Sequence, residues 1–162
     1  MLPVEFEKAL IGRQVAHIWR GHGSALFVEF GQLGPPRIRR DGLPGNAPGE
    51  VTLMIEWSWR IEKPRSIMGG SWSSERRWPA MFKKLKGSSV KAVRVFGSLP
   101  EIEVTLSNGL RIVSFMTAEG QPEWGLISRT DPKATLGVSR GKLHVDKLVP
   151  NHSFKGTPNG AH

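Results

Sequence analysis

The fold of this chain is decided by residues 51–62, VTLMIEWSWRIE. Every second residue from Val51 to Ile61 is apolar, and most of the residues between them are polar. An alternation of period two puts neighbouring side chains on opposite faces of an extended strand. We therefore predict one long strand over 51–62, with Trp57 and Trp59 on its buried face.

Residues 101–115, EIEVTLSNGLRIVSF, show the same alternation on both sides of a turn signal. Apolar residues stand at every second position from Ile102 to Leu106, and apolar positions resume at Leu110, after the segment SNG. An Asn-Gly pair is typical of a type I′ turn, because both central residues of that turn have a positive φ. This segment is therefore predicted to form a tight antiparallel hairpin.

Seven further segments carry shorter strand patterns, and Gly, Pro, Asn or Asp separates most of them. Connections of this composition favour antiparallel neighbours over long crossovers. The segments are 14–20, 24–30, 67–71, 89–96, 124–129, 134–139 and 142–146.

One internal helix is predicted from apolar residues at positions 78, 81, 82 and 85, the spacing of a single helical stripe. Pro79 suits the first turn of such a helix, and Gly87 suits the position after its end. Residues 1–10 predict a shorter helix, with Phe6 and Leu10 on one face.

At 162 residues the chain has the length of one domain, since roughly 100–200 residues make a domain. We expect a single β-rich domain over 1–149 and a mobile tail over 150–162. Residues 31–50 hold five glycines and four prolines and predict a long loop. A loop of this length is either a functional arm or a disordered insertion.

The chain also matches itself at an offset of 75 residues. This offset aligns Leu10 with Leu85, Gly12 with Gly87 and Val15 with Val90, and one inserted residue extends the match into the next strand. Further on, the triplet at 59–61, WRI, resembles the triplet at 124–126, WGL. Two similar halves, about 4–62 and 79–129, would each need the other to bury a sheet face. Coincidence between two helix–Gly–strand units is the alternative.

The predicted fold class is mainly β, of the α+β type. We expect an antiparallel bent sheet or incomplete barrel, built from two similar halves with one or two short helices.

The chain resembles a family of small uncharacterised bacterial proteins, a domain of unknown function, over about Gly12–Ile127. The resemblance implies no activity, cofactor or catalytic residue. Because similar proteins are sometimes found near toxin–immunity systems, it implies an immunity- or antitoxin-like class. The residues that carry it are Gly12, Val15, Phe30, Gly31, Trp59, Arg60, Ile61, Glu62, Gly70, Ser71, Leu85, Gly87, Val90, Ser107, Asn108, Gly109, Trp124 and Leu126.

Positive charge is concentrated in the middle of the chain. The formal net charge is +9, and residues 35–100 hold thirteen bases against five acids, a net of +8. A basic patch attracts phosphates or an acidic protein surface, whereas a solvated face is the simpler interpretation. Trp72, beside this block, is a candidate for stacking. The candidate binding residues are Arg37, Arg39, Arg40, Arg76, Arg77, Lys83, Lys84, Lys86, Lys91 and Arg94.

The sequence offers no local catalytic or metal motif. With no cysteine, disulfides, thiolate metal sites and cysteine nucleophiles are excluded, which fits a reducing, cytoplasmic compartment. The segment at 137–142, GVSRGK, is one residue short of a phosphate loop and continues with Leu143 where a Ser or Thr is needed. We therefore expect no cofactor, no metal and no enzyme activity, although distant residues can still meet in the fold.

Two functions follow as hypotheses. The first is a non-catalytic binding protein, immunity- or antitoxin-like, that uses its basic surface on an acidic protein. The second is a nucleic-acid-binding protein that contacts phosphates through the 76–94 block. No membrane partner is expected, and an unpaired edge strand at 51–62 would allow the chain to self-associate.

Overall fold

The computed structural model describes residues 1–148, so the predicted mobile tail over 150–162 lies outside the described residues. In this part of the chain, neither α-helix is long and apolar enough to cross a membrane. In chain order the elements are α1 (Val4–Leu10), β1 (Val15–Arg20), β2 (Leu26–Phe30), β3 (Val51–Ile55), β4 (Trp59–Glu62), β5 (Ile67–Gly70), the 3₁₀ helix η1 (Glu75–Arg77), α2 (Trp78–Leu85), β6 (Val90–Phe96), β7 (Glu101–Leu106), β8 (Arg111–Ser114), β9 (Trp124–Ser128), β10 (Ala134–Ser139) and β11 (Lys142–Lys147).

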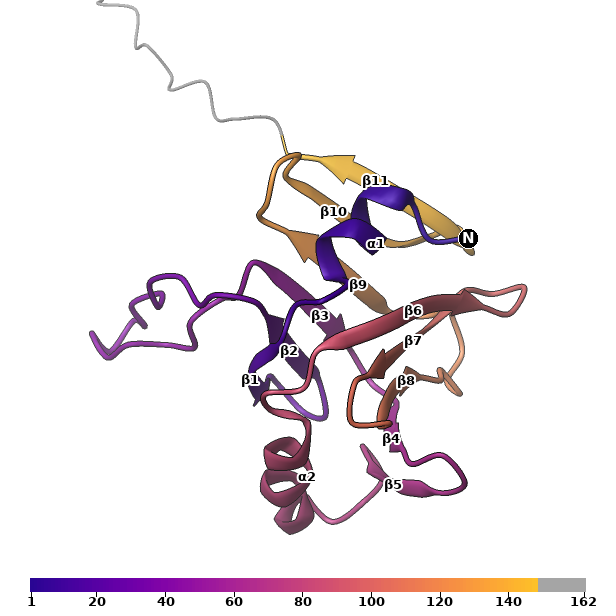
Figure 1. The fold of residues 1–162 in the computed structure, drawn as a ribbon, viewed down its shortest axis with the longest axis horizontal. Coiled ribbons are helices and arrows are strands. Elements are labelled where there is room, and N and C mark those ends of the chain that lie inside the picture. Colours follow the sequence, from indigo (N-terminus) through magenta and orange to yellow (C-terminus); the bar gives the residue numbers. More distant parts are fainter. Residues whose placement is uncertain (149–162) are drawn as a thin grey trace, which may run out of the picture.

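The strands form two antiparallel sheets (Figure 1). One has six strands in the order β1-β2-β3-β9-β10-β11, and the other has five in the order β5-β4-β8-β7-β6. Neither sheet closes into a barrel, and the apolar face of each contributes to one core. The predicted fold class is therefore confirmed: a β-rich fold with two short helices and two similar halves.

Each half supplies strands to both sheets. The first half gives β1, β2 and β3 to the six-stranded sheet and then sends β4 and β5 into the five-stranded one. The second half gives β6, β7 and β8 to the five-stranded sheet and then sends β9 and β10 into the six-stranded one. Strand β11 has no counterpart in the first half. Each three-stranded meander is thus extended by a hairpin from the other half.

The two halves meet where residues 12–15 lie antiparallel to residues 87–90. These segments exchange four backbone hydrogen bonds, and an offset of 75 residues converts each bond into another of the set. The isolated bridge between Gln14 and Ser89 lies at the centre of this arrangement. The bonds run from Gly12 N to Val90 O (2.9 Å), from Gly87 N to Val15 O (2.8 Å), from Val15 N to Ser88 O (2.8 Å) and from Val90 N to Arg13 O (2.8 Å).

Two buried tryptophans occupy equivalent places at the start of the crossing strands. The indole Nε1 of Trp59 donates to the carbonyl of Ser24 over 2.7 Å, and that of Trp124 donates to the carbonyl of Pro100 over 2.9 Å. Each acceptor lies in the connection between the first two strands of its own half. These bonds therefore tie each crossing strand back to the meander from which it departs.

The prediction of one long strand over 51–62 is wrong. Strands β3 and β4 belong to different sheets, and the chain crosses between them at 56–58. The alternation continues through the crossing because the core lies between the sheets, so both strands turn the same parity inward. Trp57 is the exception: it lies in the crossing and is 54% exposed, contrary to its predicted burial.

The expected ground for self-association is also absent. Strand β3 is paired with β2 and β9, and β4 is paired with β5 and β8, so neither is an edge strand.

The predicted hairpin is present as β7 and β8, but its turn differs from the type I′ expected. Gly109 has a φ of +86°, whereas Asn108 does not have a positive φ. Gly109 N donates to Leu106 O over 3.0 Å, and Leu106 N donates to Leu110 O over 2.8 Å. This is the three-residue hairpin loop, in which only the last loop residue is left-handed.

Residues 31–50, left open by the sequence between an arm and a disordered insertion, form a closed loop tied to the six-stranded sheet. Gly34 N donates to Pro48 O over 2.8 Å, which closes the base of the loop. Asn46 and Gly49 then bond to side chains of β1 and β2. The segment is therefore an arm held over the outer face of this sheet.

The equivalent glycines Gly70 and Gly137 give a matched test of strand packing. A Cβ at Gly70 would overlap with the backbone oxygen of Trp59, whereas a Cβ at Gly137 would lie 3.8 Å from that of Trp124. Gly70→Ala should lower the free energy of unfolding by about 2 kcal/mol, because backbone atoms must move apart. Gly137→Ala should change it by less than about 0.5 kcal/mol. Urea unfolding followed by tryptophan fluorescence measures both, and equal losses would contradict the packing described.

Candidate functional site

Helix α2 presents basic side chains outward because its apolar stripe faces the core. Trp78, Met81 and Leu85 are buried, and Trp78 Nε1 donates to the carbonyl of Gly70 over 3.1 Å. We call the exposed basic residues of η1, α2 and the residue after α2 the basic helix face. Its members are Arg76, Arg77, Lys83, Lys84 and Lys86.

The basic helix face is not neutralised by neighbouring acids. Among residues 1–148, none of its members forms an ion pair. Glu75, the first residue of η1, accepts from Arg20 over 2.7 Å and is therefore already paired. Arg77 donates to the carbonyl of Met68 over 3.2 Å and keeps its charge. Within the described residues, the charges of these five side chains are therefore not cancelled by a direct ion pair.

The last two residues of the predicted block lie on β6 instead of the helix. Lys91 is exposed. Arg94 Nε lies 2.8 Å from Glu103 Oε2 across the β6–β7 pair. Arg94 is therefore neutralised on its own sheet.

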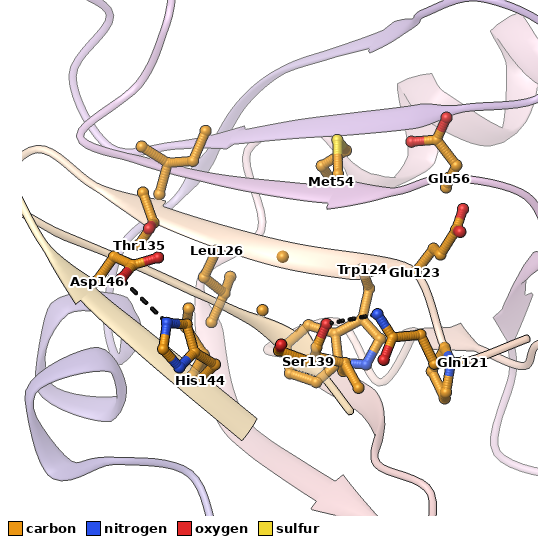
Figure 2. Close-up of a pocket in the computed structure, with 16 residues that line it drawn as sticks. Met54, Glu56, Gln121, Glu123, Trp124, Leu126, Thr135, Ser139, His144 and Asp146 are labelled. Atoms are coloured by element: carbon orange, nitrogen blue, oxygen red, sulfur yellow. Dashed lines mark hydrogen bonds and ion pairs between the residues drawn. The ribbon is translucent and has the colours of Figure 1, made fainter. Parts of the chain in front are cut away.

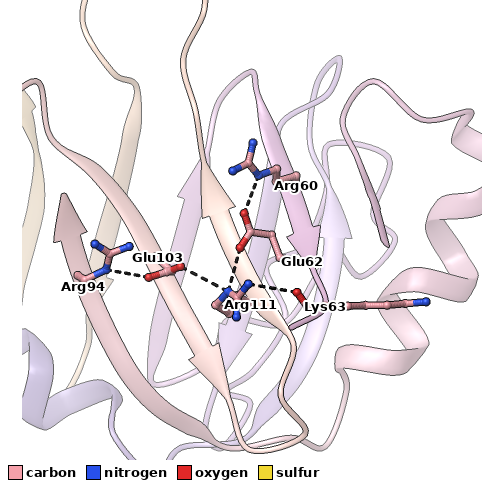
Figure 3. A network of polar contacts seen from close by, with 6 residues as sticks. All are labelled: Arg60, Glu62, Lys63, Arg94, Glu103 and Arg111. Carbon is pink, nitrogen blue, oxygen red and sulfur yellow. Dashed lines mark hydrogen bonds and ion pairs between the residues drawn. The ribbon is translucent and has the colours of Figure 1, made fainter. Parts of the chain in front are cut away.

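Arg94 belongs to a network on the outer surface of the five-stranded sheet (Figure 3). Arg111 lies between two carboxylates, 2.9 Å from Glu62 and 3.5 Å from Glu103, and Arg60 lies 2.8 Å from Glu62. Burial alone would raise the pKa of Glu62, but hydrogen bonds and charge from Arg111 and Arg60 outweigh it and lower this pKa. The charges of this network are paired with one another, so little unpaired charge is available to bind a ligand.

The three candidate arginines of the 31–50 loop do not join the basic helix face. In Figure 1 this loop lies beside β1 and β2, whereas α2 lies at another end of the molecule. Arg37, Arg39 and Arg40 are exposed, and Arg39 forms an ion pair with Asp41 over 2.9 Å. The ten candidate residues therefore divide into a helix group, a β6 group and a loop group.

Trp72, the candidate for stacking, is 80% exposed in the connection between β5 and η1. With Trp57 it lines a hollow of about 350 Å³ whose other walls include Ser24, Ser58 and Ser71. The sequence did not indicate Trp57 as its partner, because the alternation of 51–62 placed that residue in the core.

The outer face of the six-stranded sheet carries two hollows that the sequence did not indicate. The first, of about 450 Å³, lies over the paired residues Gly125 and Gly137, where side chains are missing from the sheet surface. Figure 2 shows Glu56 and Glu123 on one side of it and His144 with Asp146 on the other. His144 Nε2 lies 3.0 Å from Asp146 Oδ1. We call this the acidic hollow, defined by these four polar residues.

The second hollow, of about 330 Å³, lies between the sheet and the 31–50 loop, and we call it the loop hollow. Its wall includes Glu29, which is only 2% exposed. Glu29 accepts hydrogen bonds from Trp19 Nε1 (3.1 Å), from Gly49 N (2.9 Å) and from Thr52 Oγ1. Glu29 occupies an outward-facing position of β2. Its burial is therefore due to the loop that covers it and to the side chains around it.

Arg129 completes the loop hollow from the end of β9. Its Nη1 donates to Gly49 O over 3.0 Å and to Thr52 Oγ1 over 2.7 Å. The pKa of Arg129 is lowered overall. Burial is the largest cause, the charge of Arg37 lowers the pKa as well, and the charge of Glu29 opposes both by raising it. Among residues 1–148, no group of three or more potential metal ligands occurs in this hollow or elsewhere.

Comparison of the chain with protein-family models, with curated proteins and with solved structures gives no match.

The lowered pKa of Glu62 predicts a pH-dependent contribution to stability. Glu62→Gln should lower the free energy of unfolding by about 1 kcal/mol at pH 7, because two charged hydrogen bonds weaken. A carboxylate with a lowered folded-state pKa stabilises above its ordinary pKa of about 4.3, and this stabilisation is lost as the pH falls through the folded-state value.

Urea unfolding of wild type and Glu62→Gln at a series of pH values measures this effect. The two curves should begin to converge as the pH falls below the ordinary pKa of about 4.3, and they should meet once the pH has passed through the lowered folded-state pKa of Glu62. Glu119→Gln is the control, because Glu119 is exposed and forms no ion pair among residues 1–148. A constant difference at every pH would contradict the role given to the ionised carboxylate.

Proposed function

We propose that this protein is a non-catalytic binding protein that holds an acidic protein partner on the basic helix face. The observation that carries the proposal is a set of exposed, unpaired positive side chains on a helix whose opposite side is packed in the core. The immunity- or antitoxin-like class is part of the proposal and rests on the resemblance of the sequence.

The helix is well suited to present these charges in fixed positions. Trp78 is held by Gly70, and its ring contacts those of Trp59 and Phe82 at centroid distances of 5.3 and 6.4 Å. At the other end, Asn108 Nδ2 donates to the carbonyl of Lys84 over 2.9 Å. A preorganised surface loses less conformational entropy on binding than a flexible one.

The size of the surface favours a compact acidic patch. Eight helical residues span only ~12 Å. The sugar–phosphate backbone of a nucleic acid would bind more tightly to a longer continuous row of cations. Arg94, however, is paired with Glu103, and the loop arginines lie elsewhere. Exposed tryptophans such as Trp72 are typical anchors at the centre of protein interfaces.

Nucleic-acid binding through residues 76–94 is the second candidate. The exposure of Trp72, four residues from Arg76, favours it, because an exposed indole beside basic groups can stack on a base. This candidate predicts an affinity that falls steeply with salt for any sequence.

Charge reversal tests the proposal. The variant Lys83→Glu, Lys84→Glu, Lys86→Glu is compared with Lys133→Glu, Lys142→Glu, Lys147→Glu, which makes the same change in net charge at exposed residues of another region. Both are used with wild type to capture partners from an extract of the source cells at low and high salt, with and without nuclease. Captured proteins are quantified by mass spectrometry.

The helix variant should lose at least about 90% of an acidic protein that wild type and the control variant retain, because each reversed charge turns an attraction into a repulsion. Nuclease should leave this capture unchanged. Equal capture by all three proteins would overturn the proposal. Loss of capture on nuclease treatment, with direct binding of single-stranded DNA or RNA at low salt, would establish the second candidate instead.

A further inference from the structure

We propose that the loop hollow binds a small organic anion, a flat apolar body that carries one carboxylate. This site is separate from the basic helix face, so it stands or falls independently of the proposed function. Three features of the loop hollow support this proposal: a guanidinium edge without an acceptor, a buried carboxylate whose oxygens are already hydrogen-bonded, and an aromatic wall. A fourth feature, the carboxylates of the neighbouring acidic hollow, limits the charge of the ligand.

Arg129 supplies the guanidinium. Both hydrogens of its Nη1 are used by Gly49 O and Thr52 Oγ1. Its Nε and Nη2 donate to no acceptor among residues 1–148, although the residue lines the hollow. An Nε–Nη2 edge has the geometry that binds a carboxylate through two parallel hydrogen bonds.

The nearby acid does not compete for a cation. Glu29 Oε1 already accepts from Trp19, and Oε2 accepts from Gly49 and Thr52. Its role is to hold Trp19 and the end of the loop against the sheet. The donors to Glu29 are neutral, so its negative charge remains and acts on Arg129. Two cations, Arg129 and Arg37, outweigh this one carboxylate, so the net charge of the hollow is positive. Arg39 also lines the hollow but is paired with Asp41.

The rest of the wall suits a flat apolar body. The rings of Trp19 and Phe27 are stacked with centroids 4.0 Å apart and an interplanar angle of 11°. Ile38, Pro48 and Ile127 complete the apolar lining. The volume of about 330 Å³ lies at the lower end of small-molecule sites, which run from roughly 300 to 1,000 Å³.

The acidic hollow limits the charge of the ligand. The two hollows share Ile127, so Glu56, Glu123 and Asp146 border the space into which a longer ligand would extend. Together with Glu29, these carboxylates repel a polyanion or a doubly charged group more than a single charge. The surroundings therefore favour a small monoanion over a nucleic acid or a phosphate dianion.

The experiment is a titration of the full chain, labelled with ¹⁵N, in which the indole N–H signals are followed by NMR. Trp19→Phe assigns the Trp19 signal. The probe is 2-naphthoate, with 2-naphthylmethylamine as the cationic counterpart and naphthyl phosphate as the doubly charged one. Naphthoate at up to about 10 mM should shift the Trp19 signal with saturation, as expected for millimolar or tighter binding.

Two loop arginines give a matched pair of variants. Arg37 lines the hollow and Arg40 does not, yet both are exposed residues of the same loop. Arg37→Gln should weaken naphthoate binding about fivefold, because the hollow loses a positive charge, and Arg40→Gln should leave it within about twofold. Arg129→Lys should weaken naphthoate binding more than Arg37→Gln does, because a lysine cannot donate two parallel hydrogen bonds to a carboxylate.

Several results would overturn the inference. They are the absence of a saturable Trp19 shift with naphthoate, an equal shift with the amine, and equal weakening by Arg37→Gln and Arg40→Gln. Tighter binding of naphthyl phosphate than of naphthoate would overturn the assignment of a single carboxylate. Because none of these measurements involves the basic helix face, failure here would leave the charge-reversal result unaffected.

Discussion

The structure depends on the reciprocal hydrogen bonds between residues 12–15 and 87–90. A three-stranded meander has one apolar face and two open edges. Neither half supplies enough sheet to cover its own apolar face. The antiparallel contact fixes the halves in a two-fold relation, and the crossing hairpins then extend each meander along its edge. Trp59 and Trp124 hold the two crossings in equivalent ways. The core is consequently shared, with buried residues from both halves in one hydrophobic cluster.

The candidate functional features lie where the halves differ. Four residues, 107–110, connect β7 to β8, whereas the equivalent connection between β2 and β3 is the 31–50 loop that forms the loop hollow. Helix α2 has no acid in its first turn and has Lys83 and Lys84 in its last, whereas α1 carries Glu5 and Glu7 in its first turn and Lys8 alone in its last. Strand β11, with His144 and Asp146, has no counterpart at all. The symmetric backbone supplies stability, and the asymmetric additions are free to supply recognition.

Local patterns predicted the fold and part of the candidate site. Alternation located nearly every strand, the apolar stripe located α2, and the 75-residue offset aligned segments that are equivalent in space. The crossing at 56–58 was missed because a core between two sheets keeps the same parity inward on both sides of it. The exposed lysines of α2 were predictable from helical spacing alone. The pairing of Arg94 with Glu103 was not, because it depends on the register of two strands.

Glu29 and Arg129 show the limit of sequence reasoning and its physical cause. Arg129 bonds to Gly49, eighty residues earlier, and no local pattern connects them. Removing a carboxylate from water is costly, and well-packed apolar residues often give equal or greater stability than a buried charged group and its partners. The three hydrogen bonds to Glu29 offset that cost and fix Trp19 and the loop in one geometry. A buried charged group that an apolar one could replace without loss of stability is the kind of departure expected at functional sites, which is why Glu29 and Arg129, and not the paired network around Glu62, carry the proposed small-molecule site.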